Sequence, residues 1–208
     1  MTRRYLWAVA LAALSVAPDV CAGEAAKVGI VKGTVTVAGK PTADVVVSLE
    51  GVAPEIVKAR ISAAGPHKAV LEQKNMKFIP FVLPVLVGTT VDFPNYDKNW
   101  HNVYSKSEAK KFDLGLYAPG KSRSATFDRP GIVRILCNVH PSMEAFIVVK
   151  EHPFFTAADK SGNYRLDNVP LGKYRVQVWH PQFGITEAGV EIVRAGEVVD
   201  MNFDIKKK

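Results

Sequence analysis

The chain has 208 residues and a formal net charge of +7, with 27 Lys and Arg against 20 Asp and Glu. This length allows one or two modest domains. The positive charges are scattered and form no stripe with aromatic residues, which argues against a nucleic-acid-binding function.

The first 22 residues have the pattern of a secretory signal peptide. Arg3 and Arg4 precede an apolar run from Leu6 to Val16, and Ala22 ends a cleavage site of small residues. The run is too short to span a bilayer as a helix. Two adjacent arginines fit both an ordinary signal and a twin-arginine signal, so the export route stays open. We expect cleavage after Ala22 and a periplasmic or secreted protein.

Most of the remaining sequence has the pattern of short β-strands. Runs of apolar and β-branched residues are separated by Gly and Pro, which favours β-sandwiches. One helix is predicted over residues 54–64, where alanines and an early Glu55 favour it. The predicted strands cover residues 28–37, 45–49, two runs within 83–93 broken by Gly88, 132–136, 146–149, 164–166, 174–179 and 190–193.

One short loop carries a thiol, an imidazole and a thioether. These groups belong to Cys137, His140 and Met143, and His101 supplies a second imidazole upstream. Two His, one Cys and one weak axial Met form the ligand set of a blue-copper electron-transfer site. The sequence therefore indicates a mononuclear copper site.

The cysteine count favours a metal site over an idle thiol. Cleavage after Ala22 would remove Cys21 and leave Cys137 alone, and a lone thiol in an oxidising compartment is a liability unless a site uses it. A buried, inert Cys is one alternative. Zinc is another, but a zinc site would more often add a Cys, His or carboxylate than a Met.

Two segments resemble the framework of the plastocyanin-like cupredoxins, the blue copper proteins. The spacing of the second is similar to the short ligand loop of amicyanin and pseudoazurin, and the motif also resembles proteins found beside methylamine-oxidising systems. The resemblance covers roughly residues 67–150 and implies a Greek-key β-sandwich with copper near one end. The matching residues are Phe78-x-Pro80, Leu83-x-Val85, Gly88-x-Thr90-Val91-x-Phe93-x-Asn95-x-Asp97, His101-Asn102-Val103, Phe127-x-x-Pro130-Gly131 and Cys137-x-x-His140-x-x-Met143.

The resemblance also implies roles for individual residues. Asn102 would link the two ligand loops by hydrogen bonds. Pro141 would stiffen the ligand loop. Phe78, Phe81 and Phe146 would limit access of water to the metal. The implied ligands are His101, Cys137 and His140 in equatorial positions and Met143 as the long axial ligand.

The C-terminal part resembles a different family, the transthyretin-like or carboxypeptidase-regulatory type of immunoglobulin-like β-sandwich. Asp159-x-x-Gly162 and Pro170-x-Gly172-x-Tyr174 carry this resemblance. The strands that normally open such a domain, with Gly33-x-Val35 and Gly39-x-Pro41, lie far upstream. We therefore predict an all-β chain in which residues 27–60 and 151–208 form one discontinuous sandwich, with a cupredoxin domain of residues 61–150 inserted.

The alternative organisation is an N-terminal extension of the cupredoxin followed by a small C-terminal sandwich. About 55 residues are few for an independent core without disulfides. This favours the shared domain.

The leading functional hypothesis is a periplasmic blue-copper protein that carries single electrons and is not itself an enzyme, because no nucleophile-base pair or open metal position is recognisable. The positive charge suggests a redox partner with an acidic face, such as a cytochrome or a dehydrogenase. We expect no nucleic-acid partner and no membrane span in the mature form. Two alternatives stay open: a copper-delivery protein without a redox role, and a structural or ligand-binding β-sandwich in which the metal motif is incidental.

Overall fold

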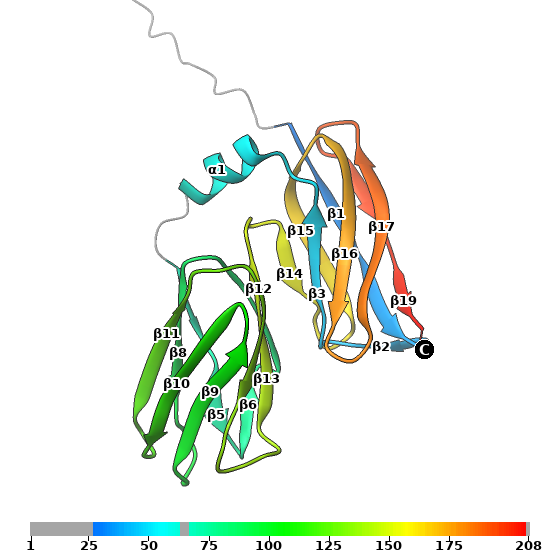
Figure 1. Ribbon diagram of the computed structural model, residues 1–208. Coiled ribbons are helices and arrows are strands. Elements are labelled where there is room, and N and C mark those ends of the chain that lie inside the picture. The colour runs from blue at the N-terminus through cyan, green and yellow to red at the C-terminus, as the bar shows by residue number, and fades with distance from the viewer. Residues whose placement is uncertain (1–26, 63–66, 207–208) are drawn as a thin grey trace, which may run out of the picture.

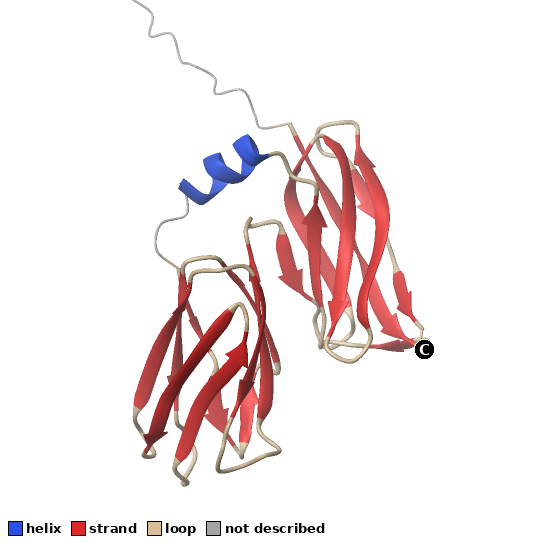
Figure 2. Ribbon diagram, in the orientation of Figure 1, coloured by secondary structure: helices blue, strands red, loops and turns tan. Residues whose placement is uncertain are grey.

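A computed structural model describes residues 27–62 and 67–206 of the protein. Strands make up most of the described chain, and its one helix is α1 (Pro54–Ser62). The strands gather in two β-sandwiches joined by α1 on one side and by the segment before β14 (Phe155–Ala157) on the other (Figures 1 and 2). The prediction of an all-β chain with two sandwiches is confirmed. The expected signal peptide lies outside the described residues.

Both ends of the chain contribute strands to the first sandwich, which we call the accessory sandwich. In one sheet β1 (Val28–Val37) pairs with β15 (Asn163–Pro170), β18 (Val198–Asp200), β19 (Phe203–Ile205) and β2 (Lys40–Pro41). The other sheet has the order β14, β3 (Val46–Glu50), β16 (Gly172–His180), β17 (Gly184–Ile192).

The two sheets of the accessory sandwich enclose one hydrophobic core. It contains Val35 and Leu49 from the N-terminal segment and Leu166 and Val176 from the C-terminal segment. Since neither segment could bury these side chains alone, we propose that residues 27–60 and 151–208 form one discontinuous domain.

Residues 68–150 form the second sandwich. A five-stranded sheet faces a three-stranded one, and Phe93, Phe127 and Ile135 are fully buried between them. A short hairpin of β5 (Glu72–Lys74) and β6 (Lys77–Ile79) extends it. The larger sheet has the order β10 (Lys110–Tyr117), β9 (His101–Ser107), β12 (Gly131–Leu136), β13 (Glu144–Lys150), β7 (Val82–Leu86), and the smaller one has the order β11 (Ser122–Phe127), β8 (Thr89–Pro94), β4 (Lys68–Val70).

The two sandwiches pack against each other because β13 is apolar on both faces. Side chains alternate between the faces of a strand. Ile147 and its alternate neighbours enter the core of residues 68–150. Phe146 and Val148 point the other way and join Val46 and Trp179 of the accessory sandwich in a separate apolar cluster.

Two specific contacts cross this interface. The rings of Phe146 and Trp179 lie 5.6 Å apart, edge to face. The Lys150 ammonium donates a 2.6 Å hydrogen bond to the Glu50 carboxylate. Phe146 therefore packs at the domain interface, whereas the sequence analysis expected it to limit access of water to the metal. The ring of Phe81 lies against that of Phe146, with ring centres 5.6 Å apart.

Candidate metal centre

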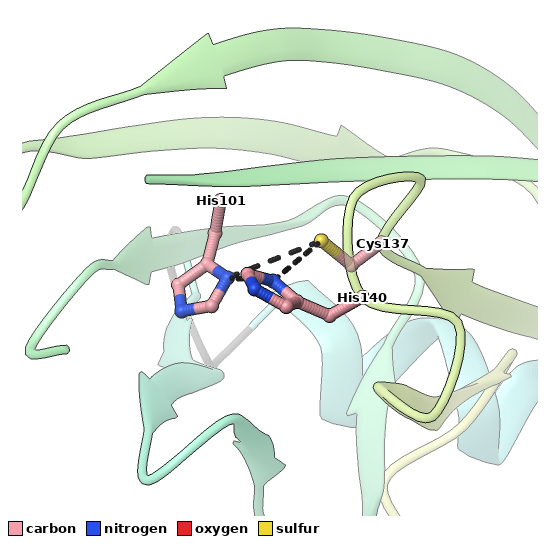
Figure 3. A group of neighbouring side chains, drawn as sticks. All are labelled: His101, Cys137 and His140. Carbon is pink, nitrogen blue, oxygen red and sulfur yellow. Dashed lines mark hydrogen bonds between the residues drawn. The ribbon is translucent and has the colours of Figure 1, made fainter. Parts of the chain in front are cut away.

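Three potential metal ligands converge at one end of the second sandwich. His101 begins β9, Cys137 directly follows β12, and His140 lies in the loop that leads to β13. The Nδ1 atoms of the two imidazoles are 3.0 Å apart (Figure 3). The Sγ atom of Cys137 lies 4.0 Å from Nδ1 of His101 and 3.9 Å from Nδ1 of His140. Among the described residues, no other group of three or more His, Cys, Asp or Glu could hold a metal ion.

The ligand loop is a compact turn between two paired strands. Leu136 and Glu144 form the last pair of β12 and β13, so residues 137–143 bridge a short gap. The Met143 N–H donates to the His140 carbonyl at 2.9 Å, which closes the turn. Met143 is 1% exposed and packs in the same core as Cys137, whereas Pro141 is exposed on the outer side of the loop.

The carboxylate of Asp97 orients the buried imidazole of His101. Its Oδ2 lies 2.8 Å from Nε2 of His101, which has no exposed surface. A carboxylate accepts a hydrogen bond, so in the neutral ring this contact favours the proton on Nε2 and leaves the lone pair on Nδ1. That lone pair is on the side of Cys137 and His140, as metal binding requires.

Asp97 is itself fixed by backbone donors. The N–H groups of Asn75 and Met76 each donate to its carboxylate at 2.8 Å. Burial alone would raise the pKa of Asp97, but the hydrogen bonds from Met76, His101 and Asn75 outweigh it and lower the pKa. The carboxylate is therefore ionised at neutral pH.

The sequence analysis included Asp97 in a family pattern but gave it no role. The signal that could have found it is a carboxylate four residues before a candidate ligand His, inside a loop rather than a helix. Asn95 supports the loop, because its Oδ1 accepts from the Asp97 N–H at 3.0 Å and its Nδ2 donates to the Asn99 carbonyl at 2.8 Å.

Asn102 connects the His101 strand with the ligand loop. Its Oδ1 accepts a long, 3.4 Å hydrogen bond from the Asn138 N–H, and its Nδ2 donates to Asp113 Oδ1 at 2.6 Å. Asn102 is 1% exposed. Its position is compatible with the linking role that the family resemblance implied.

The donor set suits copper better than zinc or a hard cation. It joins one soft thiol and two imidazoles, with a buried thioether on the same loop. Thiolate and thioether ligands favour Cu(I), and imidazole suits both copper oxidation states. A closed zinc site would call for a fourth Cys, His or carboxylate ligand, and Asp97 is engaged on the far nitrogen of His101.

Comparisons with known proteins agree with this chemistry. Residues 66–150 match the family of copper binding proteins described as the plastocyanin/azurin family. This segment is therefore a cupredoxin-like, copper-binding domain. A search of curated proteins found no match.

Several solved structures are similar to part of the chain. A copper-containing nitrite reductase from Thermus scotoductus SA-01 is 28% identical over 41% of this chain, with a TM-score of 0.39, and the match spans only 23% of that chain. A purple cupredoxin from Nitrosopumilus maritimus is 23% identical over 39% of this chain and 99% of its own (TM-score 0.36). Amicyanin from Paracoccus versutus is 22% identical over 42% of this chain and 83% of its own (TM-score 0.37).

Proposed function

We propose that the cupredoxin-like domain holds one copper ion in a mononuclear type 1 site and that the protein carries single electrons between redox partners, without being an enzyme itself. The proposed ligands are His101, Cys137, His140 and Met143. The observation that carries this proposal is the convergence of one sulfur and two Nδ1 atoms within 4.8 Å of one another. Bound copper would supply a one-electron couple between Cu(I) and Cu(II).

The protein's own part is to keep the ligand atoms in place. The Asp97 contact fixes the ring of His101, and the turn between His140 and Met143 sets the loop. A site that is fixed in this way changes little between oxidation states, which favours rapid electron transfer. Burial of Cys137 limits its reaction with water and oxidants.

The half-buried His140 is the proposed point of electron entry and exit. It is the only one of the four proposed ligands that is not fully buried. Exposed apolar side chains belong to the same loops, among them Val139 beside His140 and Trp100 beside His101, with exposed fractions of 47% and 55%. They would form the dry centre of a transient docking face.

The charges of the loops at this end favour an acidic partner. Lys74 and Lys77 flank the turn that binds Asp97, and Lys98 follows Asp97, all three exposed. Rim charges of one sign mainly raise the association rate with a partner of opposite charge. We infer a cytochrome or dehydrogenase with an acidic face, in the periplasm or outside the cell. Within the described residues, no helix is long and apolar enough to cross a membrane.

Visible absorption of the copper-loaded protein tests the site. We expect an intense blue thiolate-to-copper band in the parent protein, its loss in Cys137→Ser, and its retention in the loop control Ser142→Ala. Stoichiometric copper without the band would contradict a type 1 site and favour copper delivery. An absence of copper binding would rule out the proposal altogether.

A further inference from the structure

A cleft of about 620 Å³ lies between the two sandwiches, at the end of the cupredoxin-like domain opposite to the metal centre. β12 begins at the cleft with Gly131 and ends beside Cys137, and β13 runs back from Met143 to the cleft at Lys150. In Figure 1, α1 spans the space above this junction, and Val57 of α1 lines the cleft. The volume is within the usual range for small-molecule sites.

The floor of the cleft is apolar and comes from both sandwiches. Val46, Val148 and Trp179 line it and also form the buried cluster at the domain interface. Ile132 and Ile185 add apolar surface at the rim, where they are 41% and 56% exposed. A flat, apolar ligand would bury the exposed parts of Ile132 and Ile185 and gain the usual free energy of apolar burial.

The polar end of the cleft has hydrogen-bonding capacity that the protein does not use fully. Glu50 Oε1 accepts from both Lys150 Nζ, at 2.6 Å, and Ser48 Oγ, at 2.8 Å. Within the described residues, no hydrogen bond reaches the second oxygen, Oε2. The ammonium of Lys150 has three N–H donors, and one of them is used here. A ligand group that both donates and accepts could therefore bind to this pair.

The imidazole of His152 also borders the cleft. The residue is 8% exposed, and its buried Nδ1 has no hydrogen-bond partner among the described residues. Burial and the nearby Lys150 charge lower its pKa, so the ring is neutral near pH 7. Because Nδ1 has almost no accessible surface, it does not face the open cleft and makes none of the contacts to a ligand.

The charges that line the cleft select against ionic ligands. Two lysines, Lys58 and Lys150, are balanced by two glutamates, Glu50 and Glu151. An ion of either sign would lose hydration on entering an apolar cleft, and the lining has no net charge to offset that loss. A neutral ligand avoids both costs.

We propose that this interdomain cleft binds a neutral hydroxylated aromatic molecule of the phenol class, with one or two rings. Its hydroxyl group donates to Glu50 Oε2 and accepts from Lys150 Nζ. Its rings contact Trp179 and the exposed side chains of Ile132 and Ile185. The site belongs to neither sandwich alone, so the accessory sandwich gains a function in completing it.

Calorimetric titration of the exported, copper-loaded protein with 2-naphthol tests the proposal. The protein is kept as Cu(I) so that no electron passes from the phenol. We expect saturable one-to-one binding of 2-naphthol, and at least tenfold weaker binding of the anionic analogue 2-naphthoate. Equal affinity for the two probes would overturn the neutral class, and no saturable binding of 2-naphthol would overturn the site.

Matched variants locate the binding. Ile132→Trp fills the cleft from its exposed rim and should weaken 2-naphthol binding at least tenfold, as should Glu50→Gln. Val193→Trp changes an apolar residue of similar exposure, 56%, away from the cleft and should leave affinity unchanged. Unfolding midpoints of all variants check their folding. Unchanged binding in a folded Ile132→Trp protein would place the ligand elsewhere and refute the proposal. Neither result depends on whether the copper site carries electrons.

Discussion

The Asp97 carboxylate contacts His101 through the nitrogen that faces away from Cys137, with Oδ2 and Nε2 2.8 Å apart. One acidic side chain thus ties the buried imidazole to the turn of residues 75–76, whose N–H groups it also binds. The orientation of a proposed ligand therefore depends on a hairpin that contributes no ligand itself.

Replacing Asp97 by Asn should weaken copper binding about 10- to 100-fold, the usual cost of losing a residue that orients a metal-bound His. An amide keeps the size of the carboxylate but cannot accept hydrogen bonds on both of its ends. Competition with a copper chelator measures the affinity. Asp92→Asn changes a nearby carboxylate of β8 that makes no contact with His101 and should bind copper like the parent. Equal affinities in the two variants would show that Asp97 does not support the site.

Gly33 tests the pairing between the two ends of the chain. A Cβ at this position would collide with the backbone oxygen of Met201, which cannot move without disturbing the sheet. We expect Gly33→Ala to lower the free energy of unfolding by about 2–3 kcal/mol. Gly189→Ala is the control, because nothing lies within 4 Å of a Cβ there and its φ is ordinary. Denaturant unfolding compares the two, and equal stability would mean that the C-terminal segment does not pack on β1.

The ion pair between Lys150 and Glu50 should couple the two sandwiches. The side chains are 15% and 24% exposed, so solvent screens the pair only in part. A double-mutant cycle with Lys150→Met and Glu50→Gln should give a coupling energy of about 1–2 kcal/mol. The measurement is the free energy of unfolding of the four proteins. An energy near zero would mean that the apolar cluster alone holds the domains together.

The buried His152 should make the protein less stable in mild acid. Burial and the charge of Lys150 lower its pKa below the value of 6.5 for a free imidazole. The unfolded chain then binds the proton more readily, so stability falls as the pH drops through 6.5 towards the folded-state pKa. His152→Leu should show a flatter stability profile between pH 7 and 5. His180, whose pKa is also lowered by burial, stays in both proteins and cancels in the comparison. Parallel profiles would contradict a neutral, buried His152.

The sequence analysis located several of the strands that are buried on at least one face. The runs at 28–37, 45–49 and 132–136 correspond to β1, β3 and β12 within one residue at each end. Among the strands it missed are β9, β10 and β11, because these strands carry many charged, polar or exposed side chains and have no long apolar run. Helix α1 is described from Pro54 to Ser62, and the last two residues of the predicted helix lie outside the described residues.

The ligand candidates could be proposed from residue types and spacing, because three of them lie in one seven-residue loop. Their supports could not be found in this way. Asp97, Asn75 and Met76 meet only through the fold, and the hairpin that brings them together has no strong local signal. The domain interface was also missed, although the unbroken apolar run from Phe146 to Val149 is typical of a strand covered on both faces.

The pairing of β3 with β14 places the two attachment points of the cupredoxin-like domain side by side, since Ser48 lies opposite Phe155. A chain of roughly a hundred residues must close before this pair can form, and the entropy cost grows with the length of the flexible loop. A folded insert acts as a short, rigid link instead. The accessory sandwich should therefore complete its folding last. Any change that loosens the cupredoxin-like domain, including the loss of bound copper, should then also destabilise the accessory sandwich, which contributes none of the proposed metal ligands.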